Sequence, residues 1–294
     1  MDARYETFLT LCRFMNYRKT AQELHLTQPA VTRQIQSLEE EFGTKLFLYD
    51  HRKLSRTPSS GTLESYIQAA RHNYNSLRED LKPGLMRTIR VGATKTIGDY
   101  LIPDAVEEYL SSGDRNIELV IDNTELLLTM LCDGRLDFAL VEGNFEKERY
   151  SYRLLQNEGF TGICSSAHRF AGKKVQLPEL FSESLIIREK GSGTRDIFER
   201  ELAGRGYSFG AFARCIEISS FSLISRLVAG GIGVSFTYQS VVKEREDIAH
   251  FSVEGFARSH EFNTVWLKNA KLPKEGGLFL EQINRTAHSS MPQA

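Results

Sequence analysis

The sequence predicts an α+β protein of several parts: a small helical domain at the N-terminus, a long helix, and a larger α/β domain. Three observations support this prediction. The chain has 294 residues, about twice the size of a typical domain. Its first 57 residues contain short helical patterns separated by turns. From Thr88 onward, short β-like runs alternate with helical stretches, which is typical of largely parallel sheets.

The composition is that of an ordinary globular protein, with 41% hydrophobic residues, 26% charged residues and a formal net charge of −1. Residues 1–90 carry 14 Lys and Arg against 10 Asp and Glu, so the N-terminal part is the more basic one. No apolar leader follows the first residues, and the longest uncharged stretch, residues 227–242, is too short and too polar to cross a bilayer. We therefore expect a soluble, cytoplasmic protein with no membrane partner.

The cysteines and histidines do not form a metal-binding pattern. The four cysteines are far apart in the sequence, and the seven histidines lack the spacing of metal ligands. We expect no metal site, no cofactor and no disulfide framework. Each cysteine is expected to be a small buried side chain in a reducing compartment, and redox sensing by Cys164 and Cys215 is not favoured.

Residues 1–57 are predicted to form three helices and a hairpin. Apolar residues recur at helical spacing from Phe8 to Met15, and a second short helix fits residues 19–24. Thr27 has the character of an N-cap, and Gly43 of the glycine that ends a helix. Residues 47–54 predict a small hairpin with basic residues at its turn. The second and third helices have the arrangement of a helix-turn-helix.

The third helix exposes polar side chains near its N-terminal end, where a DNA-reading helix contacts the major groove. Amide, hydroxyl and guanidinium groups there can reach base edges and phosphates. Basic residues of the hairpin are expected to bind DNA phosphates. Such contacts fix the position of the protein along the duplex more than they determine its sequence preference. The predicted DNA-binding residues are Gln28, Thr32, Arg33, Gln36, Arg52, Lys53 and Arg56.

Residues 58–85 predict one long helix with an apolar stripe, which ends at Pro83 and Gly84. The stripe can pack against its own domain, or it can form the seam of a helix–helix dimer, which we favour. Its members are Leu63, Tyr66, Ile67, Ala70, Tyr74, Leu77 and Leu81.

Two polar loops, residues 92–98 and 188–195, each follow a predicted strand and open a helix. This geometry directs free backbone N–H groups into the loop, so each loop is a natural anion site to which hydroxyl groups add donors. The expected effector-binding residues are Thr94, Lys95, Thr96, Ser192, Gly193 and Thr194.

The roles of three further residues near these loops are open. Arg195 can pair with a carboxylate or lie on the helix surface, and we favour the surface. Asn123 can face the cleft or cap a helix. Glu142 would disfavour a doubly charged anion unless Lys95 offset its charge, so the charge of the ligand is open.

The segment Gln28 to Ile35, Gln-Pro-Ala-Val-Thr-Arg-Gln-Ile, resembles the signature of the winged helix-turn-helix of LysR-type transcriptional regulators. Two departures stand out: Thr20 replaces a usual alanine, and Ser55-Arg56 replaces a usual apolar residue before the wing's end. Further matches to the family pattern are Leu38-Glu39, Gly43, Leu46-Phe47 and Thr57 to Gly61.

The resemblance covers essentially the whole chain and implies its division into parts. It implies an effector domain with a periplasmic-binding-protein-like fold of two subdomains. The implied parts are a winged helix-turn-helix over residues 1–57, a linker and dimerisation helix over 58–87, and an effector domain over 88–294, whose subdomains comprise 88–162 with 267–294, and 163–266.

The resemblance also implies partners and a mechanism. It implies sequence-specific binding to double-stranded promoter DNA, a homodimer through the linker helix, a homotetramer, and RNA polymerase as a further partner. A small-molecule effector, expected to be a small anion or carboxylate, would bind between the two subdomains and modulate DNA binding or activation.

A solute-binding protein or a small-molecule-metabolising enzyme is the alternative to a regulator. The sequence contains no Walker-type phosphate loop, no His-Glu-x-x-His and no Gly-x-Ser-x-Gly. Gly231 to Phe236 begins like a dinucleotide fingerprint, but Phe236 stands where its last glycine belongs. We therefore do not expect an enzyme.

Overall fold

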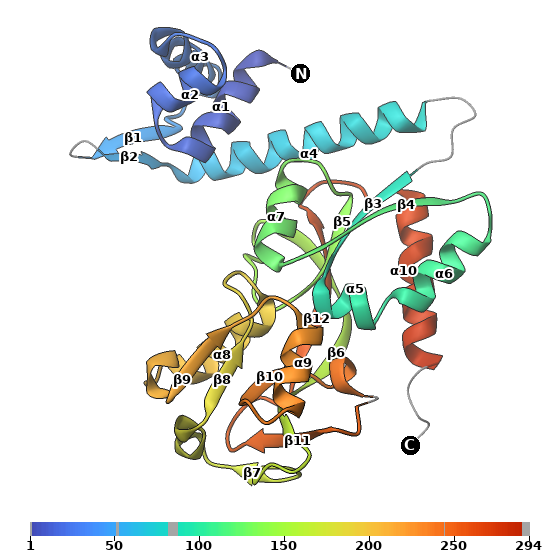
Figure 1. Cartoon of the computed structure of the whole chain (residues 1–294). Helices are drawn as coiled ribbons and strands as arrows, with labels where there is room; N and C mark the ends of the chain where they lie inside the picture. The colour runs from blue at the N-terminus through green and yellow to red at the C-terminus, as the bar shows by residue number, and fades with distance from the viewer. Residues whose placement is uncertain (1, 51–52, 82–87, 244, 290–294) are drawn as a thin grey trace. The chain divides into compact units, whose positions relative to one another are not determined.

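The computed structural model describes residues 2–50, 53–81, 88–243 and 245–289 (Figure 1). The chain forms two compact units, one of residues 1–83 with 267–271, the other of 84–266 with 272–294. No helix of the described ranges is long and apolar enough to cross a membrane. Within the same ranges, no group of three or more His, Cys, Asp or Glu side chains is arranged to hold a metal ion.

The first unit is a winged helix-turn-helix followed by a long helix. An apolar core that includes Phe8, Leu11, Ile35, Leu38 and Ile67 holds the helices together. Its elements are α1 (Ala3–Phe14), α2 (Tyr17–Glu23), α3 (Gln28–Phe42), the antiparallel strands β1 (Phe47–Asp50) and β2 (Lys53–Arg56), and α4 (Pro58–Asp80).

The ends of α3 lie where the local signals predict them. The Ala30 N–H donates to the Thr27 hydroxyl at 3.3 Å, and Gly43 ends the helix with a left-handed φ of +62°. A glycine adopts this conformation without the steric penalty of a Cβ. The predicted recognition helix is therefore confirmed as an element.

The apolar stripe of α4 divides into two parts. Leu63 and Ile67 are buried in the core of the first unit. Tyr66, Tyr74 and Leu77 are more than half exposed, with 61%, 53% and 52% of their surface accessible, and so is Leu81, the C-cap residue after α4, with 71%. Each of the two alternatives for the stripe therefore fits a different set of its residues.

The second unit begins with a sheet in which β3 pairs in parallel with both β4 and β5, and β12 joins antiparallel to β5. Figure 1 shows α6 beside α10, and the Tyr109 and Phe279 rings of these helices meet at 5.2 Å. Its elements are β3 (Thr88–Thr94), α5 (Lys95–Tyr100), α6 (Pro103–Ser111), β4 (Asn116–Asp122), α7 (Thr124–Cys132), β5 (Phe138–Glu142), β12 (Ser259–Leu267) and α10 (Lys274–Ser289).

The rest of the second unit is built on β8, which pairs in parallel with β9 and β10, while β6 runs antiparallel to β10. Aromatic side chains fill its core, and Phe198 stacks on Phe236 at 4.0 Å. The elements are β6 (Tyr150–Ser165), β7 (Lys174–Val175), β8 (Ser184–Ile187), α8 (Gly193–Ala203), β9 (Arg214–Glu217), α9 (Phe221–Ala229), β10 (Val234–Tyr238) and β11 (Ile248–Val253), with 3-10 turns at Leu177–Ser182, Phe209–Ala211 and Gln239–Val242.

The strand order across both sheet regions is β4-β3-β5-β12-β6-β10-β8-β9. The neighbouring strands β12 and β6 connect the two regions. The expected subdomain boundary between residues 266 and 267 falls within β12, which pairs with β5 from Phe262 to Val265. A buried strand that continues from one subdomain into the other shows no composition change at the crossing. The predicted class, a helix-turn-helix with a two-part α/β domain, is confirmed.

Candidate effector site and DNA-reading surface

The predicted base-contacting residues share the outer side of α3. Gln28, Arg33 and Gln36 are exposed, and Thr32 is half-buried. The Gln28 amide donates to the Thr32 hydroxyl at 2.9 Å, so these two side chains form one polar unit. The opposite side of α3 is buried through Val31, Ile35 and Leu38. One side of the helix is therefore free for a groove while the other holds the fold.

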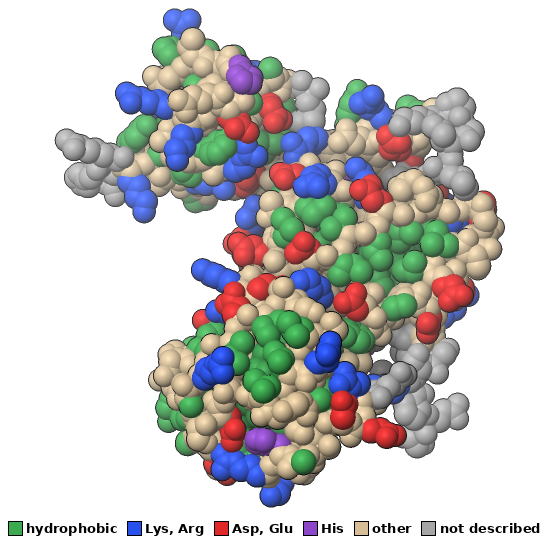
Figure 2. All heavy atoms as spheres, in the orientation of Figure 1, with side chains coloured by type: hydrophobic (Ala, Val, Ile, Leu, Met, Phe, Trp, Pro, Cys, Tyr) green, Lys and Arg blue, Asp and Glu red, His purple; other side chains and the backbone are tan. Residues whose placement is uncertain are grey.

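The wing residues differ from one another. Lys53 is exposed on β2, whereas Arg52 lies outside the described residues. Arg56 forms an ion pair with Glu64, a largely buried residue of α4. Figure 2 shows several Lys and Arg side chains on the visible face of the first unit. Lys53 is thus available to a phosphate, and Arg56 would have to leave or share its carboxylate partner to reach one.

Three of the predicted effector-binding residues converge on one carboxylate. Glu142 ends β5 and is only 2% exposed. The Thr94 hydroxyl donates to Oε2 of Glu142. The hydroxyls of Thr96 and Thr194 donate to Oε1, at 3.2 Å and 3.5 Å. We call Thr94, Thr96, Thr194 and the Glu142 carboxylate the hydroxyl cluster.

Three segments bring the hydroxyl cluster together. Thr94 ends β3, and Thr96 lies in the first turn of α5. Thr194 lies in the first turn of α8. All three threonines are buried. Strand–loop–helix connections on two sides of Glu142 therefore direct their hydroxyl donors at one point.

Burial raises the pKa of Glu142, and the hydrogen bond from Thr94, the charge of Arg188 and the hydrogen bond from Thr96 act in the opposite direction. The pKa of the fully buried Tyr238 phenol is also raised well above its ordinary value, by burial and then by the charge of Glu142. The cluster is thus a buried environment in which the neutral form of the Glu142 carboxyl group persists to a higher pH than in an exposed glutamate.

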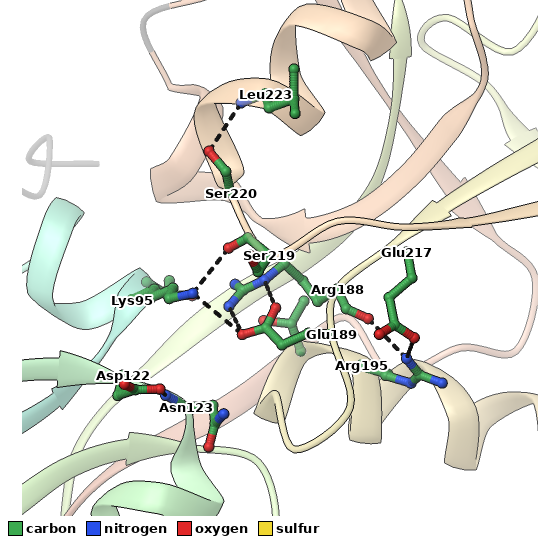
Figure 3. A network of polar contacts seen from close by, with 12 residues as sticks. Lys95, Asp122, Asn123, Arg188, Glu189, Arg195, Glu217, Ser219, Ser220 and Leu223 are labelled. Atoms are coloured by element: carbon green, nitrogen blue, oxygen red, sulfur yellow. Dashed lines mark hydrogen bonds and ion pairs between the residues drawn. The ribbon is translucent and has the colours of Figure 1, made fainter.

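The Lys95 ammonium, which could have offset Glu142, faces other groups. It lies 3.4 Å from a Glu189 carboxylate oxygen and donates to the Ser219 carbonyl at 3.1 Å (Figure 3). The Arg188 guanidinium is 3% exposed, donates twice to Glu189 at 2.8 and 2.9 Å, and lies 4.1 Å from the centre of the Phe221 ring. Lys95 and Arg188 therefore share Glu189 beside the cluster.

The sequence pattern alone assigns no role to Arg188 or Tyr238. The signal for Arg188 was present, because it directly follows the fully buried run Leu185–Ile187 of β8. A charged residue at such a position has to find partners inside the fold. Tyr238 ends the buried strand β10 and carries no comparable signal, since an apolar run with a terminal tyrosine is an ordinary core strand.

Ser192 and Gly193 lie at a cavity beside the hydroxyl cluster. This cavity has a volume of about 550 Å³ and lies between the start of α7, the segment after β5 and the start of α8. Its wall carries charges of both signs, including Glu125, Arg149 and Arg200. The six expected effector residues are thus divided: Thr94, Thr96 and Thr194 meet at Glu142, Lys95 faces Glu189, and Ser192 and Gly193 line the cavity.

Arg195 and Asn123 are held by internal contacts. The Arg195 side chain is only 16% exposed, pairs with Glu217 and donates to the Arg188 carbonyl at 3.1 Å (Figure 3). The expectation that Arg195 lies on the helix surface is wrong, because its guanidinium satisfies a backbone carbonyl beside β9. Asn123 caps α7 by accepting from the Leu126 N–H at 2.9 Å.

Burial disfavours the thiolate form of two of the cysteines, Cys164 and Cys215. Burial raises the pKa of Cys164 to about 11, and burial also raises the pKa of Cys215. A raised pKa lowers the fraction of reactive thiolate. Cys215 is exposed, so the expectation that every cysteine is buried is wrong at this position.

Comparison with known proteins agrees with this architecture. Residues 3–60 match the bacterial regulatory helix-turn-helix of the lysR family, and residues 82–287 match the LysR substrate-binding domain. The transcriptional regulator YwqM of Bacillus subtilis is 30% identical over 256 residues, which cover 83% of each chain. The RuBisCO operon transcriptional regulator of Allochromatium vinosum is 27% identical over 94% of this chain and 93% of its own length.

Solved structures share the fold. Corynebacterium glutamicum OxyR, in a C206 mutant, has a TM-score of 0.60 at 21% identity and covers 98% of this chain and 91% of its own. The Synechocystis CcmR regulatory domain in complex with 2-PG has a TM-score of 0.61 at 22% identity and covers 69% of this chain and 98% of its own. With a helix-turn-helix unit and an effector domain that both match, the chain belongs to the LysR family of transcriptional regulators.

Proposed function

We propose that the hydroxyl cluster is the effector site of this regulator and that its effector is a small oxyanion or carboxylate. The observation that carries the proposal is the convergence of Thr94, Thr96 and Thr194 on the carboxylate of Glu142. Hydroxyl donors that fit one carboxylate fit the oxygens of another small anion, without adding charge. The Lys95 ammonium and the backbone and hydroxyl donors of Ser192 and Gly193 complete the site.

The ligand of one structure with the same fold supports the choice of a small oxyanion or carboxylate as effector. The CcmR regulatory domain, which has the same fold, was solved in complex with 2-PG. In this chain the two sequence segments that carry the cluster, residues 92–98 and 188–195, belong to the two different sheet regions. A ligand held by both segments would favour one arrangement of the subdomains, and its differential affinity would set the regulatory response.

The first unit supplies DNA recognition. In our proposal Gln28, Thr32, Arg33 and Gln36 contact base edges of double-stranded promoter DNA. Arg52, Lys53 and Arg56 hold phosphates. The regulator acts in the cytoplasm and catalyses no reaction.

Oligomerisation is assigned to α4. Tyr66, Tyr74, Leu77 and Leu81 are exposed large side chains on this helix. Burial of such a row between two copies of α4 would make the seam of a homodimer. Two dimers would form the tetramer that bridges the halves of a promoter site, where RNA polymerase is the further partner.

A thermal-shift screen against small oxyanions and carboxylates tests the effector site. A ligand that binds only the folded protein at a hundredfold excess over its Kd adds roughly 2.7 kcal/mol of stability. Thr96→Ala and Thr194→Ala should each abolish the shift of a hit. Thr129→Ala, at an exposed threonine of α7, is the matched control and should keep it. A hit that is indifferent to both cluster variants would move the site elsewhere.

A further inference from the structure

The proposed anion site already contains an anionic side chain. The Glu142 carboxylate uses the Thr94, Thr96 and Thr194 hydroxyls that an oxyanion effector would need. An effector bound to the same donors would lie against this carboxylate in a buried environment. Two like charges at such a distance repel each other strongly where water does not screen them.

Among the residues that the structure describes, the cations near Glu142 are already bound to Glu189. From the segment after β8, Arg188 acts on Glu142, but two of its nitrogens are bound to Glu189. From β10, the buried Tyr238 phenol, whose pKa is raised by burial and by the charge of Glu142, adds no positive charge. From α5, Lys95 faces Glu189 and Ser219. From α7, the Thr124 hydroxyl donates to the Glu142 backbone carbonyl at 3.1 Å.

We propose that an oxyanion binds this cluster together with one proton, which Glu142 takes up from solvent. The proton adds to a carboxylate oxygen, and no other bond forms or breaks. The resulting carboxylic acid donates a hydrogen bond to the bound anion instead of repelling it. This inference rests on the proposed function. It adds that the negative charge of the ligand is accommodated by protonation of Glu142.

The alternative carriers of the proton are less suited. The Arg188 guanidinium has no acceptor atom for a further proton, and the Tyr238 phenol already carries its proton. The Glu189 carboxylate is held in its ionised form by Arg188 and Lys95. Glu142 forms no ion pair among the described residues, so protonation there breaks none.

Unsatisfied donors beside the cluster also favour an acceptor as ligand. Within the described part of the chain, the Nη1 group of Arg188 and the Tyr238 hydroxyl are buried without a hydrogen-bond partner. Buried donors without partners are uncommon in native proteins and call for an explanation. An anion with several oxygens can accept from such groups once the negative charge of Glu142 is neutralised.

Calorimetry of the full-length protein measures the proton directly. Sulfate and glycolate serve as probes because both stay fully ionised between about pH 5.5 and 8. Binding enthalpies in two buffers of different ionisation enthalpy give the number of protons taken up. Above the pKa of Glu142 in the free protein, we expect an uptake close to one proton and an affinity that falls about tenfold per pH unit. Below that pKa, Glu142 already carries the proton, so both effects should disappear.

Two variants assign the proton. Glu142→Gln keeps the shape and cannot ionise, so it should bind the probes with no proton uptake and no pH dependence. Glu125→Gln, at an exposed residue on the wall of the neighbouring cavity, should keep the uptake of the parent protein. Uptake that persists in Glu142→Gln would assign the proton to another group and overturn the inference.

The remaining outcomes separate this inference from the proposed function. Binding of sulfate or glycolate without proton uptake at every pH between about 5.5 and 8 in the parent protein would overturn the inference and leave the anion site standing. If neither probe binds the parent protein or Glu142→Gln, both the inference and the proposed ligand class are wrong. Tight binding of an amine, such as putrescine, that is lost in Glu142→Gln would show that Glu142 stays ionised and pairs with a cation.

Discussion

Gly143 and Gly193 meet backbone to backbone beside the hydroxyl cluster. A Cβ on Gly143 would lie 2.8 Å from the Cα of Gly193, and a Cβ on Gly193 would lie 2.5 Å from the backbone oxygen of Glu142. Gly143 directly follows β5, and Gly193 begins α8. The absence of a side chain at both positions therefore allows the segment after β5 to contact the start of α8.

This contact predicts that Gly193→Ala destabilises the effector domain. The new methyl group would overlap backbone atoms, which cannot move as a flexible side chain can, so we expect a loss of about 1–3 kcal/mol. Gly277→Ala in α10 is the control, because a Cβ there meets no atom within 4 Å. It should be neutral or stabilising by up to about 1 kcal/mol. Denaturant unfolding compares the two, and equal midpoints for Gly193→Ala and the parent would contradict the contact.

The buried Glu142 predicts a pH-dependent stability difference. Its pKa in the folded protein is raised above the ordinary value of 4.5, chiefly by burial. The stability that the protonated group contributes is thus fully present below pH 4.5 and is lost as pH rises through the folded pKa. Glu142→Gln, which cannot ionise, should gain stability relative to the parent protein as pH rises. Thermal unfolding across this pH range measures the difference, and a difference that stays constant or shrinks would speak against a buried, uncompensated carboxylate.

Thr20 predicts a stabilising substitution in the helix-turn-helix. It is fully buried, and within the described residues its hydroxyl has no hydrogen-bond partner. Thr20→Val keeps the shape and removes the unsatisfied group, so we expect a gain of about 1 kcal/mol. Thr7→Val makes the same change where the hydroxyl donates to Gln34 at 2.5 Å, and it should instead lose stability. Unfolding of the two variants measures the signs, and a shared sign would refute the assignment.

Alanine substitutions of Arg33, Lys53 and Arg56 should affect DNA binding differently, because Arg33 and Lys53 are exposed whereas Arg56 is paired with Glu64. Arg33→Ala should cost about 1–3 kcal/mol on the preferred duplex and relax the sequence preference. Lys53→Ala should weaken all duplexes alike and reduce the salt slope by about 0.9. Arg56→Ala should change the slope less, because the Arg56 side chain is already paired with Glu64. Fluorescence anisotropy at several salt concentrations, on a duplex selected from a random pool, measures all three, and equal slopes for Lys53→Ala and Arg56→Ala would contradict this distinction.

The parts of the fold that depend on local signals could be predicted from the sequence. The bounds of α3 follow from Thr27 and Gly43, and both effector loops follow from strand–loop–helix order. Glu142 could be placed after a strand for the same reason. Its partners could not be predicted, because Thr94, Thr96 and Thr194 lie 46 to 52 residues away along the chain.

Other differences have the same origin. The pairing of Arg56 with Glu64 depends on where the wing turns back onto α4, and the pattern of basic residues carries no information on this. The burial of Arg195 depends on the position of Glu217 in β9, 22 residues later. The extent of β12 in the first sheet depends on its pairing with β5. Sequence patterns show which side chains are polar, whereas tertiary packing decides which of them meet.

The position of a bound oxyanion is the most direct test of the effector site. A crystal structure with selenate in place of sulfate would locate the anion by its anomalous scattering. We predict selenate oxygens within hydrogen-bond distance of the Thr94, Thr96 and Thr194 hydroxyls, with the Glu142 carboxyl group turned to donate to the anion. Selenate in the neighbouring cavity, with the three hydroxyls still bound to Glu142, would contradict it.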